Sequence, residues 1–306
     1  MSETLSRVAV FFAFIALGAV LVRFKRLDRN GLNGLTAYFY WLAFPCWLLV
    51  GFSRLPPLDA AHARVLLVYL AAMLAAAAIA VLLMRLSGGD RARSVAAGMA
   101  AMVNNSAFLG APVAASLFGP KVMIMAPLVV AADFLVLFSL GCAGLAKASG
   151  HTFREALIHT AKNPTVIGAA LGVALMSFGV RFPPVLDGAL DLLGKSGPPV
   201  ALVALGGMLG LMPASRLIRP DRLSVFALLG KLLLAPALVA LALHLLRADP
   251  LTFRVCVFLS ATPTAVSVFV QTRMYDFWSE GAARTVAQGT LISLFTLCGL
   301  ALLLTA

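Results

Sequence analysis

Residues Met102–Gly119 read MVNNSAFLGAPVAASLFG, and the remainder of the chain is best understood from this stretch. It is apolar enough to lie in a membrane, yet it carries two adjacent amides, Asn104 and Asn105, and then Gly110 and Pro112. In lipid, each of these residues costs helix propensity, hydration or a backbone hydrogen bond. The pattern predicts an interrupted membrane helix, and secondary transporters bind small anions and coupling ions at such interruptions near the bilayer midplane.

A second interruption is predicted at residues 260–265, which read SATPTA. Pro263 lies between Thr262 and Thr264 in an apolar segment. Proline kinks are common in membrane helices, and a neighbouring threonine often satisfies the freed carbonyl, so the motif alone also fits a plain kink. Opposite the asparagine stretch, it predicts the second wall of a site at which N-terminal helix dipoles converge on an anion.

The composition indicates a protein that crosses the membrane many times. Of 306 residues, 61% are hydrophobic and 12% charged, and this apolar share exceeds the roughly one half that is usual in soluble domains. The four cysteines lie apart in apolar segments, without the spacing of metal ligands or redox pairs. A net charge of +12 could indicate nucleic acid, but the Lys and Arg residues lie in short loops beside apolar spans, where they indicate orientation.

Ten apolar runs of about 20 residues are each long enough to cross a bilayer as a helix. The predicted spans are residues 5–22, 32–52, 64–84, 95–118, 121–146, 163–180, 184–212, 223–246, 252–273 and 282–304. One set of alternate loops holds about twice as many basic residues as the other, which predicts that both termini lie outside the cytoplasm. The expected location is a bacterial-type inner membrane. The loops are short, so function is expected within the membrane.

The two halves of the chain are weakly alike. Residues 118–119 (FG) precede residues 137–140 (LFSL) at the same spacing at which residues 275–276 (YD) precede residues 294–297 (LFTL). The same separation along the chain that relates these matching segments also relates Asn105 to Thr262. Short matches in apolar sequence also arise by chance, but five spans per half would insert the halves in opposite senses. The predicted fold is therefore an all-α integral membrane protein of ten helices, built from inverted five-helix repeats at residues 1–150 and 151–306, with helices 4 and 9 broken and crossed.

The amides and hydroxyls of the two interruptions are the candidate site. Such groups can also simply join helices in lipid, for roughly 1 kcal/mol each. Consecutive amides, however, point about 100° apart on a helix, so one of them must reach backbone or a cavity. Amides suit a carboxylate because they donate hydrogen bonds without a buried charge. The predicted substrate-binding residues are Asn104, Asn105, Ser106, Thr262 and Thr264, with helix breaks at Gly110, Pro112 and Pro263.

Asp133 lies well inside the fifth predicted span, and Lys231 lies inside the eighth. Asp133 would cost several kcal/mol if ionised in lipid, so it is either an ion-coupling group or a neutral hydrogen-bonding partner. Lys231 lies about one turn from the predicted cytoplasmic end, where its side chain could reach the interface. Gln288 and Thr290 are either polar lining near the second break or interhelical contacts.

Motifs for other classes of protein are missing from the sequence. The four histidines form no His-Glu-x-x-His motif, and neither a Gly-x-Ser-x-Gly elbow nor a paired Asp motif is present. Gly88-Gly89 has no following Gly-Lys-Ser/Thr, so no nucleotide site is expected. We expect no metal, no cofactor and no enzymatic activity. A channel would need a continuous polar stripe, whereas the polar residues gather near two depths.

The segment Asn105–Pro112 (NSAFLGAP) resembles the Asn-Thr-x-x-x-Gly-x-Pro segment of the auxin efflux carrier family. Residues Ala261–Pro263, with Phe269, Arg273 and Tyr275, resemble that family's Ala-x-Pro segment. The resemblance extends over the whole chain in length and span count. It implies the fold of sodium/proton antiporters and bile-acid symporters, with a scaffold domain from helices 1, 2, 6 and 7. The transport domain would comprise helices 3–5 and 8–10.

By this resemblance Asn105 hydrogen-bonds the substrate carboxylate, and Pro112 and Pro263 fix the breaks. The plant carriers have proline where this chain has Asn104, and a further proline where it has Val268. The long cytoplasmic loop of many plant members is also missing here. For bacterial relatives, small dicarboxylates or amino-acid-like anions are the usual suggestion. The resemblance therefore implies a class of substrate, small organic anions, and no particular substrate.

The sequence thus predicts a secondary active, efflux-type carrier for a small organic anion. It would work by alternating access, as the crossed-helix domain moves in the manner of an elevator against the scaffold. Expected partners are a small carboxylate and membrane lipid, with no nucleic acid. Coupling to protons or sodium, and a homodimer through the scaffold domain, are left open. The alternatives are an anion channel or uniporter and, after these, an intramembrane enzyme.

Overall fold

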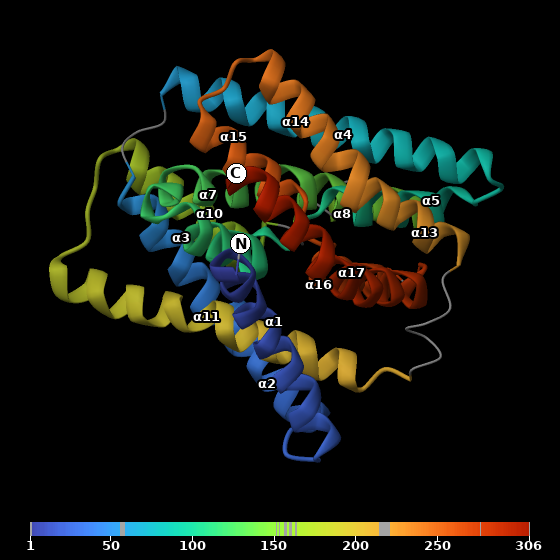
Figure 1. The fold of residues 1–306 in the computed structure, drawn as a ribbon. Coiled ribbons are helices and arrows are strands. Elements are labelled where there is room, and N and C mark those ends of the chain that lie inside the picture. Colours follow the sequence, from blue (N-terminus) through green and yellow to red (C-terminus); the bar gives the residue numbers. More distant parts are fainter. Residues whose placement is uncertain are drawn as a thin grey trace.

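The computed structural model describes residues 2–55, 59–150, 152, 154–155, 158, 161–162, 164–213, 221–275 and 277–305, and the regular elements in these ranges are all helices (Figure 1). Six are long and apolar enough to cross a membrane: Arg29–Ser53, Ala60–Leu86, Pro120–Ala148, Pro184–Gly210, Arg222–Leu245 and Ser279–Thr305. Shorter apolar helices are Ala9–Arg23, Ser106–Phe118, Val166–Ser177 and Pro250–Ser260. The predicted all-helical, multi-pass class is confirmed at this level.

The first half contains α1 (Ser2–Arg23), α2 (Arg29–Tyr38), α3 (Phe44–Ser53), α4 (Ala60–Leu86), α5 (Arg91–Met102), α6 (Ala111–Phe118), α7 (Ala126–Ala132) and α8 (Ser139–Ala148). The second half contains α10 (Pro164–Ser177), α11 (Pro184–Gly210), α13 (Arg222–Leu229), α14 (Ala235–Leu245), α15 (Pro250–Ser260), α16 (Val266–Met274) and α17 (Ser279–Thr305). Wider π-helical turns occur at η1 (Phe39–Ala43), η2 (Ser106–Gly110), η4 (Asp133–Phe138) and η5 (Gly230–Leu234), and η3 (Pro120–Ile124) is a 3-10 turn. Several long spans are therefore chains of α-helix and π-turn, and such turns often mark functional sites.

Aspartate side chains cap the starts of several of these helices. The carboxylates of Asp28, Asp59, Asp90, Asp221 and Asp249 accept backbone N–H groups in the first turns of α2, α4, α5, α13 and α15. A cap of this kind stabilises a helix by about 1 kcal/mol, because the first N–H groups have no intrahelical partner. These caps explain where the helices begin.

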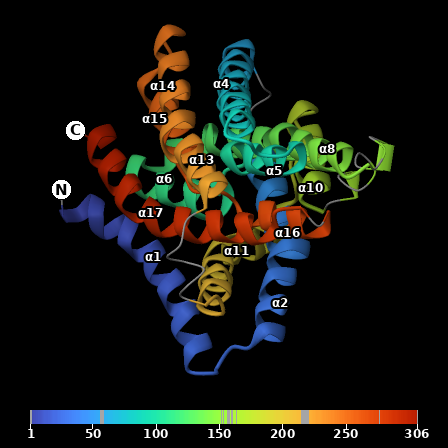
Figure 2. The same cartoon turned by 90° about the vertical axis from the view of Figure 1, so that its right-hand side faces the viewer.

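The helices pack in two groups. The first helix group consists of α1, α2, α3, α10 and α11, and the second of α4, α5, α8 and α13 to α17 with the short α6 and α7 (Figure 2). In the first group, glycines bring backbones into contact, since a Cβ on Gly206 of α11 would overlap the Ile15 carbonyl of α1. A Cβ on Gly18 would overlap the Val203 carbonyl in the same way. Small residues at such contacts let membrane helices approach closely.

This contact between α1 and α11 predicts a large effect of a side chain at Gly206. Gly206→Leu should lower the melting temperature of the purified protein by about 5 °C or more, because overpacking of this kind costs at least about 1–3 kcal/mol. Gly188→Leu is the matched control, as Gly188 lies in the same helix and a Cβ there would meet nothing within 4 Å. Equal melting temperatures for the two variants would contradict the contact.

Candidate functional site

The two predicted interruptions are present and lie against each other. The helical backbone stops between α5 and η2 at residues 103–105, and between α15 and α16 at residues 261–265. The N–H of Asn105 donates to the Pro263 carbonyl at 2.8 Å, and the N–H of Ala265 donates to the Val103 carbonyl at 3.1 Å. Residues 104 and 264 form an antiparallel bridge between these bonds. Backbone groups freed by each break therefore satisfy groups of the other, as buried backbone requires.

The three residues expected to break the helices have different positions. Pro263 lies inside the second interruption, whereas Gly110 and Pro112 lie beyond the first, in continuous helical backbone. Pro112 is the second residue of α6 and directly follows the wider π-helical turn η2, and as a proline it has no N–H to donate within this helical segment. Gly110 gives room instead, because a Cβ there would lie 2.6 Å from Leu259 Cδ2 and 3.0 Å from Thr262 Cγ2. The first break is thus at Val103–Asn105, several residues before the predicted glycine and proline.

Asn104 and Ser106 both point to Asp133. Ser106 Oγ donates to one Asp133 oxygen at 2.6 Å, and Asn104 Nδ2 donates to the same oxygen at 3.0 Å. Tyr69 of α4 donates to the other oxygen at 2.8 Å, and Asn104 Nδ2 also lies 2.7 Å from the Tyr69 hydroxyl. All four side chains are at most 1% exposed. Two residues predicted to bind substrate therefore hold a buried carboxylate. Sequence reasoning missed Tyr69, a lone hydroxyl in an Ala- and Leu-rich span.

The threonine hydroxyls of the second interruption bond to backbone. Thr262 Oγ1 donates to the Leu259 carbonyl at 2.7 Å, and Thr264 Oγ1 donates to the Ala100 carbonyl of α5 at 2.7 Å. Both residues are fully buried. The Thr264 side chain thus joins the second interruption to α5, whereas the Thr262 side chain caps its own helix α15, and neither residue lines the nearby cavity.

Lys231 lies in η5 and is fully buried, so its side chain does not reach the membrane surface. Its Nζ donates to the carbonyl of Ser260, the last residue of α15. The ammonium is therefore at the second interruption, whereas Asp133 is at the first.

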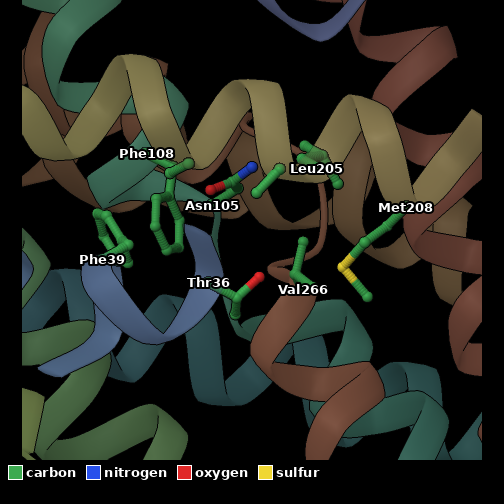
Figure 3. A pocket seen from close by; sticks show the side chains of 9 residues that line it. Thr36, Phe39, Asn105, Phe108, Leu205, Met208 and Val266 are labelled. Carbon is green, nitrogen blue, oxygen red and sulfur yellow. The ribbon is translucent and has the colours of Figure 1, made fainter. Parts of the chain in front are cut away.

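Asn105 is the predicted site residue that faces a cavity (Figure 3). Both polar atoms of its amide are buried without a hydrogen-bond partner in the protein, and the residue is 1% exposed. The cavity measures about 40 Å³ and is lined by Thr36, Phe39, Asn105, Phe108, Ala201, Ala204, Leu205, Met208 and Val266. Thr36 donates its hydroxyl to the Leu32 carbonyl at 2.8 Å. None of these lining residues is charged, so the Asn105 amide is a polar group on the wall of a mainly apolar cavity.

A larger vestibule adjoins this cavity on one side. It measures about 680 Å³ and shares Leu205, Met208 and Val266 with the cavity as lining residues. Its other walls come from the start of α2, the end of α11 and the start of α17, and they include Arg29 and Glu280. The basic turn between α1 and α2, which contains Lys25 and Arg26, lies at this end of the molecule.

Aromatic rings lie on the opposite side of the cavity. The Phe108 ring is 3.9 Å from that of Phe39 and 5.6 Å from that of Phe44, between ring centroids. Phe44 stacks on Trp47 at 6.0 Å, and Trp47 lines a separate cavity of about 370 Å³ that also contains Arg54. These four rings, the aromatic cluster, lie between the Asn105 cavity and this separate cavity.

The apolar helices and the interrupted segments indicate a multi-pass membrane protein with a cavity between two helix groups. This arrangement is typical of carriers. Residues 151–301 match the family model described as "Membrane transport protein". A protein of Rhizobium meliloti (strain 1021) named "Putative malonate transporter" is 27% identical over 308 residues, 98% of this chain and 95% of the relative. "Auxin efflux carrier component 8" of Arabidopsis thaliana is 26% identical over 144 residues, 47% of this chain and 39% of the relative. The predicted resemblance to the auxin efflux carrier family is thus confirmed, and the chain is similar over nearly its whole length to a protein named as a transporter.

Proposed function

We propose that this protein is a secondary active carrier for a small organic carboxylate, which the Asn105 amide binds where the two interruptions meet. The observation that carries the proposal is the pair of unpartnered polar atoms on Asn105, buried at the wall of an apolar cavity. A buried amide without partners costs about 1–3 kcal/mol, so a gain elsewhere must offset it. A carboxylate oxygen at Nδ2 would supply that gain.

The start of α16 supports an anion as the ligand. Val266 is the first residue of α16 and also lines the cavity. The first N–H groups of a helix lack intrahelical acceptors, and they carry the positive end of its dipole. Asn105 and this helix start would therefore hold one carboxylate group without a buried cationic side chain.

The arrangement of helix groups supports alternating access. We assign the first helix group to the scaffold, because its glycine contacts make it stiff, and the second to the moving transport domain. Ten spans in inverted repeats at residues 1–150 and 151–306 fit the matching caps, since Asp59 and Asp90 begin helices in one half as Asp221 and Asp249 do in the other. The Asn105 cavity lies between the two groups.

The openings support an inward-facing arrangement. The large vestibule lies at the basic end, which the positive-inside rule assigns to the cytoplasm, and both termini would then be extracytoplasmic in a bacterial inner membrane. The aromatic cluster would close the path to the other side. A cavity of about 40 Å³ has room for about three water molecules at ~10–15 Å³ each, so binding requires the two helix groups to separate slightly.

Proton coupling through Asp133 is part of the proposal. Two donors to its carboxylate, Asn104 and Ser106, flank Asn105 in the chain. Protonation of Asp133 would change both hydrogen bonds and so shift the amide that binds substrate. Uptake of a proton and release of an anion would be linked through three consecutive residues.

The named relative makes malonate the first substrate to test, but the cavity favours a carboxylate with an apolar body. A second carboxylate would be buried among uncharged side chains at a cost of several kcal/mol. In proteoliposomes we expect saturable uptake of labelled butyrate, with butyrate competing at least about tenfold better than malonate, since each 1.4 kcal/mol is tenfold in affinity. Malonate competing better than butyrate would contradict the single-carboxylate site. No uptake of either, together with no shift in melting temperature across a carboxylate panel, would contradict the carrier itself.

A further inference from the structure

Lys231 is a lysine with no access to water. It is 0% exposed, and the adjacent Gly230 packs closely on Ala80 and Ala101, which shows how tightly this part of η5 is enclosed. A buried ammonium costs several kcal/mol unless a partner compensates for its lost hydration. Groups at the second interruption must therefore compensate for the free-energy cost of burying this ammonium.

The partner of Lys231 is the carbonyl end of a helix. Its Nζ donates to the carbonyl of Ser260, with which α15 ends before the second interruption. The last carbonyls of a helix have no intrahelical donor and carry the negative end of its dipole. In carriers with interrupted helices, carbonyls at such ends coordinate Na⁺. Here an ammonium from the protein's own chain supplies positive charge at that point.

Asp133 completes the charge balance at the other interruption. Ser106, which donates to Asp133, is the first residue of η2, so the carboxylate lies at the positive end of the helical segment that follows. The two interruptions are hydrogen-bonded to each other through the Asn105 N–H and the Pro263 carbonyl, so the Asp133 carboxylate and Lys231 Nζ belong to one buried polar region. One helix end at each interruption thus has its counter-charge within the protein, whereas the start of α16 faces the cavity.

We propose that Lys231 is a resident cation that stands in for a coupling Na⁺ at the carbonyl end of α15, with Asp133 as its counter-ion. The carrier therefore needs no sodium. This goes beyond the proposed function, which assigns proton coupling to Asp133 and gives Lys231 no role, and its first tests need no substrate.

The sharpest test removes the Lys231 ammonium by mutation and supplies a small ammonium ion in solution instead. Lys231→Ala removes three carbons and the ammonium group, so it leaves a cavity of the size and shape of a propylammonium ion. Lys231→Met fills most of the same space with an uncharged side chain. In choline chloride, we expect both variants to melt about 5 °C or more below the unaltered protein. Propylammonium chloride should restore at least half of this loss in Lys231→Ala and none in Lys231→Met. Equal effects of propylammonium on the two variants and the unaltered protein would overturn the proposal.

A second pair of variants covers the case in which Lys231→Ala cannot be purified even with propylammonium present. Lys231→Met combined with Asp133→Asn removes both charges and should melt above each single variant, because neither single variant leaves a compensated charge. A double variant that melts below both would count against the pairing. The melting experiments test the role of Lys231 whether or not transport of a carboxylate is observed.

Transport gives the remaining check once a labelled substrate is taken up. Uptake by the unaltered protein should be the same in NaCl and in choline chloride, within twofold. Accumulation that requires an inward sodium gradient would refute the resident cation, while leaving the carboxylate carrier intact.

Discussion

Replacing Asn105 by alanine should reduce uptake of labelled carboxylate by reconstituted protein by at least about tenfold. The amide is the cavity's unpartnered polar group, and a lost hydrogen bond to a charged ligand is worth about 1.5–3 kcal/mol, or roughly tenfold to a hundredfold in affinity. The same change should leave the melting temperature equal or slightly higher, because it removes a polar group that is buried without a partner.

That opposite movement of activity and stability separates a binding role from a structural one. An amide that merely holds helices together would lower both when removed. Asn30→Ala is the matched control, since Asn30 is an exposed amide in α2 and should change neither quantity. Uptake by Asn105→Ala at the level of the unaltered protein, for every carboxylate that is transported, would remove Asn105 from the site.

Asp133→Asn should abolish accumulation driven by a pH gradient while leaving exchange of labelled for unlabelled substrate across the membrane. The amide keeps the size of the side chain and one acceptor oxygen, but it can neither carry charge nor take up a proton at neutral pH. Exchange requires only the loaded carrier to move, whereas accumulation requires coupling. The measurement is uptake into proteoliposomes with and without an imposed pH difference, followed by counterflow at equal pH.

Asp187→Asn is the control for this experiment. Asp187 is also a carboxylate in a long helix, but it lies in the first turn of α11 and pairs with Arg54 at 2.6 Å. Its replacement should leave pH-driven accumulation unchanged. If Asp133→Asn still accumulates substrate in response to the pH gradient, Asp133 holds Asn104 and Ser106 in place and has no part in coupling.

The sequence was informative wherever the physical cause is local. Apolar length predicts helices that can span a bilayer, and the low helix propensity and polarity near Asn104 and Pro263 predict breaks close to where they occur. The divergence of two consecutive amides also follows from helix geometry alone, and in the structure Asn104 and Asn105 do point to different surroundings. Asp133 is recognisable as unusual because any carboxyl in an apolar span must have a partner.

Tertiary structure decided which partner each polar group has. Asn104 bonds Asp133 and Thr264 bonds the Ala100 carbonyl because helices distant in the sequence lie beside them, and Asn105 remains facing the cavity. The apolar lining from η1 and α11 has no sequence signal, since residues such as Phe39 and Leu205 look like ordinary lipid-facing or core positions. A helix break depends on the residues within one turn, whereas a binding surface depends on which helices meet across it.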